Sequence, residues 1–149
     1  MSFYRPDDFG DRGLRHEVNV FVYRLEQAAP EYLLLRATPR LEQSWRPVVG
    51  AVDWDEDLRH AALRQARAET GLLRAWDLVA PAPGLVEEVG DLRLIEWPFG
   101  LQAAPGWHGP RDGRGDAAFD WCGFEQALDV LGRSLHRQNL LQLHLRLAA

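Results

Sequence analysis

Side chains that could take part in metal or phosphate chemistry gather in one stretch of the sequence. It runs from Val48 to Leu72 and reads VVGAVDWDEDLRHAALRQARAETGL, with an acidic run at Asp53–Asp57 and the polar pair Gln65 and Glu69 near its end. Mg²⁺ prefers hard oxygen ligands, and a bound dication balances the negative charge that spreads over a reacting phosphoryl group. The stretch therefore suggests metal-dependent chemistry.

A helix is expected to carry these groups. The segment Glu56–Thr70 contains no glycine or proline, its alanines and leucines recur at helical spacing, and Gly71 follows where a C-cap glycine belongs. At about 100° per residue, one stripe of this helix is apolar: Leu58, Ala62 and Ala66. The adjacent stripe is the predicted site face: Gln65, Ala68 and Glu69.

The stretch resembles the Nudix box, whose pattern is Gly, five residues, Glu, seven residues, then Arg-Glu-aliphatic-any-Glu-Glu-any-Gly-aliphatic. The matching positions are Gly50, Glu56, Arg64, Glu69, Gly71 and Leu72. Trp45 shortly before the box and FDWCGFEQAL near the chain end extend the similarity. The resemblance implies a Nudix-type α/β/α sandwich, an α/β fold with a mixed β-sheet flanked by helices, spanning residues 1–149 as a single domain.

The resemblance also implies an activity. In that family three helix glutamates bind divalent cations, which bridge a diphosphate and help to activate water for attack at phosphorus. The implied cofactor is Mg²⁺ or Mn²⁺, and the implied ligand is a small nucleoside triphosphate or another nucleoside diphosphate-linked compound.

The sequence departs from the family pattern at two of those three glutamates. Gln65 and Ala68 stand in place of the first two, and only Glu69 remains. Loss of two carboxylates beside a dication should lower metal affinity sharply. The carbonyl of Gln65 could still contribute to a weak, substrate-dependent site, whereas Ala68 offers no ligand. Two hypotheses follow: a pyrophosphohydrolase with weakened or re-sited activity that uses Glu69 and Gln65, and an inactive nucleotide-binding or regulatory module.

Acids beside the helix could compensate for the two losses. Asp53, Asp55 and Asp57 precede it, although a solvated acidic run near a positive helix N-terminus is the more ordinary interpretation. Glu56 is a second candidate metal ligand after Glu69, and its alternative is a structural ion pair with Arg64, which the resemblance favours.

Acids outside the box are weaker candidates. Asp116 lies at the offset before Trp121 where many relatives carry another glutamate, but a loop aspartate is more often a turn residue. Glu87 and Glu88 lie in a turn-like segment and are expected to be exposed, whereas Glu96 lies on a predicted strand and could face a cleft or solvent.

Substrate contacts are expected from arginine and tryptophan. Arg36 and Arg46 flank the strand before the box and could fork onto phosphate oxygens, as could Arg40. Trp107, in a glycine- and proline-rich loop predicted from Ala103 to Asp116, is the best candidate for stacking on a base. The alternative for tryptophan is a core role, which we expect for Trp121 and mainly for Trp45.

The remaining elements follow from apolar runs and turn residues. A hairpin or two sequential strands are predicted at Glu17–Leu25 and Tyr32–Ala37, and a third strand at Trp45–Val52. Further strands are predicted at residues 76–81, 92–102 and 117–124, separated by turn-rich segments, and two helices at residues 124–132 and 134–149.

Composition limits the class of protein. The chain has 149 residues, 46% of them hydrophobic, and a formal net charge of −5, which offers no general attraction to polymeric nucleic acid. Cys122 is the only cysteine, and no apolar run is long enough for a membrane span. We expect a soluble cytoplasmic protein without a membrane partner. A homodimer through the apolar C-terminal helix is a further expectation.

Overall fold

Two long parallel strands form the centre of the sheet: β1 (Leu14–Arg24) and β6 (Leu92–Ala103). The computed structural model describes residues 13–26, 28–37, 44–72, 74–110 and 117–148. The seven-stranded sheet has the order β4-β6-β1-β2-β7, with β3 paired to β1 and β5 paired to β6. The outer strands are β2 (Glu31–Ala37), β3 (Val48–Ala51), β4 (Ala75–Val79), β5 (Leu85–Val89) and β7 (Ala117–Cys122).

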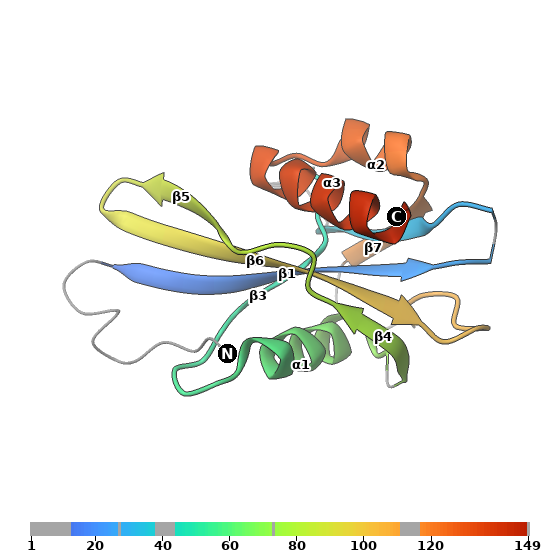
Figure 1. Ribbon diagram of the computed structural model, residues 1–149, viewed down its shortest axis with the longest axis horizontal. Coiled ribbons are helices and arrows are strands. Elements are labelled where there is room, and N and C mark those ends of the chain that lie inside the picture. Colours follow the sequence, from blue (N-terminus) through green and yellow to red (C-terminus); the bar gives the residue numbers. More distant parts are fainter. Residues whose placement is uncertain (1–12, 27, 38–43, 73, 111–116, 149) are drawn as a thin grey trace.

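Helices cover both faces of this sheet. The helix α1 (Leu58–Thr70) lies on one face, and α2 (Phe124–Val130) and α3 (Ser134–Ala148) lie on the other (Figure 1). The predicted mixed sheet flanked by helices is therefore confirmed. All other strand pairs are antiparallel, including β1 with β2, which form the predicted hairpin.

The alternation of side chains along β1 builds two separate cores. Val18, Val20 and Val22 join the core beneath α1, whereas Phe21 and Tyr23 join the core beneath α2 and α3. All five are nearly or fully buried, which is why this strand reads as a continuous apolar run. The polar residue Asn19 falls on the α3 face of the same strand and is completely buried.

The sequence prediction was wrong for β5. The segment was expected to be turn-like, but it pairs antiparallel with β6 from Leu85 opposite Glu96 to Val89 opposite Leu92. Gly90, with φ of 61°, makes the tight turn between the two strands. The edge of β6 supplies backbone hydrogen-bond partners for this segment. Its conformation is therefore set by pairing with β6 and not by the turn propensity of its own residues.

Element boundaries moved by a few residues elsewhere. The helix α1 begins at Leu58 and not at Glu56, because Asp55 has φ of 81° and Asp57 is extended. Its predicted end is confirmed, since Gly71 adopts φ of 76° and donates its N–H to the Arg67 carbonyl. The strand β1 begins at Leu14, three residues before the predicted start, because β6 continues to pair with it.

The helix α3 packs tightly onto β6 at Gly100. A Cβ at this glycine would lie 2.5 Å from Cδ1 of Leu143, so only glycine permits the approach. Leu140 and Leu143 are fully buried there, whereas Leu141 and Leu145 on the opposite side of the helix are exposed. None of the described helices combines the length and the apolar character that crossing a membrane requires.

Replacing Leu143 by alanine should lower the free energy of unfolding by about 2–5 kcal/mol, because it opens a cavity between α3 and β6. Leu145→Ala on the same helix is the matched control, since its side chain is 58% exposed. Urea denaturation followed by circular dichroism measures both values. Equal losses in the two variants would contradict this packing of α3.

Candidate functional site

Gly50 on β3 lets the side chain of Gln65 cross from α1 to the sheet. A Cβ at Gly50 would lie 2.2 Å from the Gln65 side chain, so any other residue would displace the amide. Gln65 Nε2 reaches within 3.5 Å of the Val49 carbonyl. The close backbone approach predicted at this glycine is confirmed, and it brings the strand and the site face of α1 together.

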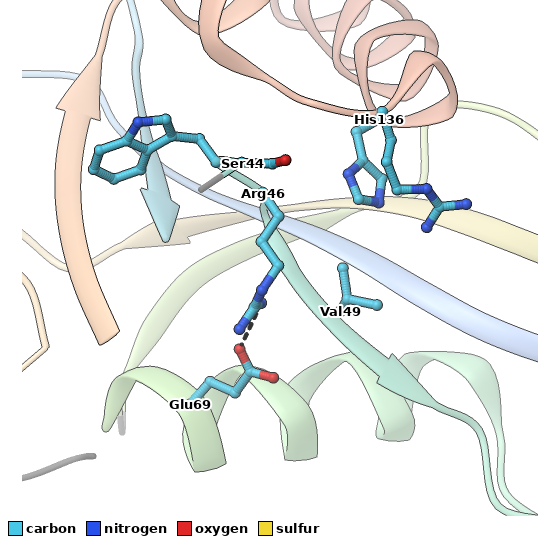
Figure 2. Close-up of a pocket in the computed structure, with 7 residues that line it drawn as sticks. Ser44, Arg46, Val49, Glu69 and His136 are labelled. Atoms are coloured by element: carbon cyan, nitrogen blue, oxygen red, sulfur yellow. Dashed lines mark hydrogen bonds and ion pairs between the residues drawn. The ribbon is translucent and has the colours of Figure 1, made fainter. Parts of the chain in front are cut away.

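Glu69 is held by two neighbouring side chains. Its Oε1 accepts a hydrogen bond from Arg46 Nη1 at 3.0 Å, and its Oε2 accepts one from Gln65 Nε2 at 3.2 Å. The same Arg46 nitrogen donates to the Pro47 carbonyl, which fixes the guanidinium beside the carboxylate. The structure thus brings together three of the predicted site residues, and Figure 2 shows Arg46 reaching from the segment before β3 towards Glu69 on α1.

A pocket of about 370 Å³ opens beside this ion pair. Its lining comes from the segment before β3, from β3, from α1 and from the start of α3: Ser44, Trp45, Arg46, Val49, Glu69, Arg133 and His136. The volume is within the range of small-molecule sites. Apolar and charged groups therefore converge on one cavity at the retained box glutamate.

Glu56 lies outside this pocket and forms the ion pair predicted with Arg64. Its Oε2 accepts from Arg64 Nε at 2.8 Å and from His60 Nδ1 at 2.8 Å, while its Oε1 accepts from Arg64 Nη2 and from the Asp53 N–H. The Arg64 hydrogen bond, helped by those from Asp53 and His60, outweighs burial and lowers the pKa of Glu56 to about 2. Both oxygens are engaged, so a metal would have to displace these bonds.

The other candidate acids do not line the pocket. Asp53 is 74% exposed and lies 4.0 Å from Arg64, and Asp55 and Asp57 are exposed. Ala68 is exposed as well and faces a second, basic hollow beside Arg64. The predictions for Asp116 and Arg40 lie outside the described residues.

The tryptophans considered for substrate contact lie in different parts of the structure. The guanidinium of Arg36 lies 4.8 Å from the ring centre of Trp45, which lines the pocket. Trp107 does not line it, because this ring packs edge-to-face against Trp121 and onto the core beneath α1. Trp45 therefore lines the pocket and Trp107 does not, and the Arg36 guanidinium lies over the Trp45 ring.

Sequence reasoning missed Arg133 and His136. Arg133 immediately precedes α3, and His136 lies in its first turn. Neither a motif nor a polar run marks this segment in the sequence. Glu96, to which both are bound, carried the only signal, because it is a carboxylate within an apolar strand. Glu87 was expected to be exposed, but it pairs with Arg133 and its side chain is only 38% exposed. Glu88 is exposed, as expected.

The carboxylate and imidazole groups of the site do not form a donor set for a tightly held dication. Within the described ranges, no three His, Cys, Asp or Glu side chains are placed to bind one metal ion. Glu69 is the only box glutamate left on the site face, and its carboxylate already neutralises a guanidinium. A dication there would meet the positive charge of Arg46, so the residues present do not fit the Mg²⁺ or Mn²⁺ that the family resemblance implies.

Comparison with protein families decides the relationship of this chain. The family model described as "NUDIX domain" matches residues 14–142. The chain belongs to the Nudix family. A search of curated proteins gives no match. Nudix enzymes generally use divalent metals, whereas the described residues of this chain form no cluster of three metal-binding side chains.

Solved Nudix structures share the fold. A putative NUDIX hydrolase from Listeria monocytogenes has a TM-score of 0.76 at 16% identity and covers 89% of this chain and 94% of its own. The E. coli dihydroneopterin triphosphate pyrophosphohydrolase has a TM-score of 0.72 at 18% identity, covering 88% and 95%. The NUDIX domain of Shewanella oneidensis NrtR, complexed with ADP ribose, has a TM-score of 0.70 at 17% identity, covering 97% and 94%.

Replacing Glu56 by glutamine should lower the free energy of unfolding at pH 7 by about 2 kcal/mol, through loss of a charged hydrogen-bond acceptor. Because the folded-state pKa is depressed from 4.5 to about 2, the wild-type contribution is complete above 4.5 and is lost as pH falls towards 2. Denaturation curves across this range measure it. Glu88→Gln is the exposed control, and a difference between wild type and Glu56→Gln that persists unchanged at pH 2 would contradict the assignment.

Proposed function

We propose that this chain is a Nudix-fold protein that binds a nucleoside diphosphate-linked compound or a nucleoside triphosphate, and in which pyrophosphate hydrolysis is weak or lost. The observation that carries the proposal is the Arg46–Glu69 ion pair at the mouth of the pocket. It places a side-chain cation where the box resemblance leads us to expect a metal ion.

An arginine at this position suits phosphate oxygens. The guanidinium is planar, stays charged at any physiological pH and presents several N–H donors in a fixed fork. Only Nη1 of Arg46 takes part in the contacts with Glu69 and Pro47, and the side chain is 33% exposed. The remaining N–H groups can reach a bound diphosphate while Glu69 and Pro47 hold the arginine in place.

The replacements in α1 agree with this charge arrangement. Gln65 donates to Glu69 through its amide, which a glutamate at the same position could not do at neutral pH. Two further carboxylates would add negative charge close to the phosphates, and only a dication could offset it. Gln65 and Arg46 together suit a phosphate group that binds without a tightly held metal.

Solved relatives indicate the size and class of the ligand. They include an Ap4A hydrolase, a dihydroneopterin triphosphate pyrophosphohydrolase and a domain complexed with ADP ribose, and all three of these compounds are small molecules that contain linked phosphates and a heterocycle. The apolar wall at Trp45 and Val49 and the cationic mouth at Arg46 suit the same combination in this chain.

A second candidate is a slow pyrophosphohydrolase. It is favoured by family membership and by the retention of Glu69, which is 22% exposed at the pocket. Under this alternative Glu69 would be the carboxylate on which turnover depends.

Binding should persist when divalent cations are removed. Isothermal titration with ADP ribose and with inorganic pyrophosphate, in EDTA and in Mg²⁺, should give dissociation constants that agree within about threefold. Arg46→Gln should weaken both ligands about tenfold or more, through loss of a charged hydrogen bond. Arg67→Gln, an exposed arginine of α1 away from this pocket, is the control. Binding that requires Mg²⁺ and ignores Arg46→Gln would overturn the proposal.

Hydrolysis should be slow in the wild type and should increase when the missing carboxylates return. The double variant Gln65→Glu, Ala68→Glu is expected to gain Mg²⁺-dependent phosphate or nucleotide release, because it restores oxygen ligands around Glu69. Chromatography of ADP ribose and nucleoside triphosphate reactions measures the products. Rapid wild-type turnover that Glu69→Gln abolishes would favour the hydrolase candidate instead.

A further inference from the structure

The turn before α1 presents a tryptophan to solvent. Trp54 and Asp55 are the central residues of a β-turn, which the Glu56 N–H closes on the Asp53 carbonyl at 3.0 Å. The φ of Asp55 is 81°, the sign that the third residue of a type II turn requires. Trp54 at the tip of this turn is 57% exposed. So much indole surface in water is unusual, because this side chain is highly buried in most folded proteins.

The turn is tied to α1 at its base. The Asp53 N–H donates to Glu56 Oε1 at 2.9 Å, and Arg64 and His60 of α1 bind the other oxygen of the same carboxylate. Trp54 is therefore carried on a backbone that is already fixed. A side chain on a preorganised turn loses less conformational freedom on binding, which favours a role in contacts.

A hollow of about 340 Å³ lies on the side of α1 that does not pack onto the sheet. The described residues that line it are His60, Leu63, Arg64, Arg67 and Ala68. Leu63 and Ala68 supply apolar surface, and the two arginines supply positive charge. The volume is within the range of small-molecule sites, so one aromatic side chain can enter.

The turn and the hollow are neighbours and opposite in charge. Asp53, Asp55 and Asp57 are exposed around Trp54, and Asp53 lies 4.0 Å from Arg64 of the hollow. Figure 1 shows the connection from β3 running directly into α1. The Trp54 ring does not line the hollow of its own chain. A projecting indole flanked by acids and a hollow that carries arginines are complementary in shape and in charge.

We propose that two copies of this chain associate through these two features, with Trp54 of each copy inserted into the hollow of the other. A surface that carries both the projection and the matching cavity is self-complementary, as a two-fold symmetric dimer requires. Each inserted ring packs on Leu63 and Ala68 and lies against Arg67, while the acids beside it approach the arginines of the second copy. This inference is independent of what the ligand pocket binds.

The small side chain at position 68 suits this contact. The box pattern has a glutamate here, and a glutamate would occupy part of the hollow and place a carboxylate against the acidic turn of the second copy. Like charges brought together in an interface oppose association. Ala68 leaves the space that the indole needs and adds no negative charge. The substitution that removes a metal-binding position thus opens the docking position.

The oligomeric state tests the proposal. Sedimentation equilibrium in EDTA, over a wide range of protein concentration, should show a monomer–dimer equilibrium. Trp54→Ala should raise the dissociation constant of the dimer about tenfold or more, because buried tryptophans are frequent hot spots of interfaces. Ala68→Glu and Arg67→Glu should weaken the dimer from the other side of the contact. Leu145→Ala is the matched control, since Leu145 is 58% exposed on a different helix. Thermal unfolding checks that each variant is folded.

Mixing two defective variants gives a sharper test. Trp54→Ala keeps an intact hollow, and Ala68→Glu keeps an intact tryptophan. A mixed dimer places both defects in one contact and leaves the symmetric contact whole, whereas neither variant alone can form a whole contact. The equimolar mixture should therefore dimerise about threefold or more tightly than either variant, because it regains one of two equal contacts. Added salt should weaken the wild-type dimer by screening its charges.

Three results would overturn the proposal. The first is a wild-type protein that stays monomeric at every concentration. The second is a dimer that Trp54→Ala leaves intact and Leu145→Ala disrupts, which would indicate the interface at the C-terminal helix that the sequence predicts. The third is a mixture of Trp54→Ala and Ala68→Glu that dimerises no better than its components, because reciprocal insertion of the tryptophans requires that gain.

Discussion

The close contact between α1 and β3 is the constraint on which the site depends. Gly50 has no side chain, and the Gln65 amide occupies the space where a Cβ would lie. This contact sets the distance between the helix that carries Glu69 and the strand that begins after Arg46. With a larger residue at Gly50, Gln65 would have to move, and its hydrogen bond to Glu69 would be lost with it. The position of Gln65 beside Glu69 thus depends on glycine at position 50.

The sheet separates two kinds of interior. The core beneath α1 is apolar and includes Val18, Val20 and Phe99, which explains how a helix with so many alanines is held in place. The interior beneath α3 contains a polar patch around Glu96 within an otherwise apolar packing. Such a patch is expensive to bury, and Glu96 within it contacts two residues that line the pocket, Arg133 and His136.

The charges of the site have been redistributed relative to the family pattern. A box with three glutamates concentrates negative charge that needs a metal ion, whereas this chain has one glutamate neutralised by Arg46. Glu56 and Arg64 keep their ion pair and organise the loop before α1. The box residues that form the structural ion pair are therefore retained. Two of the three positions at which the family pattern has metal-binding glutamates are instead Gln65 and Ala68.

The sequence by itself determined the fold class, the first two strands, the end of α1 at Gly71 and the Glu56–Arg64 pair, because each follows from local spacing or from the box pattern. It also predicted Gln65, Glu69 and Arg46 as site residues, and the structure brings their side chains into contact. Only the tertiary structure decided that β5 is a strand, that Trp45 and not Trp107 lines the pocket, and that Arg133 and His136 meet Glu96. These depend on contacts between residues distant along the chain, such as the 3.5 Å approach of His136 to Glu96. Periodicity along one segment cannot specify which other segment it will face, so such contacts appear only when the sheet and its helices are assembled.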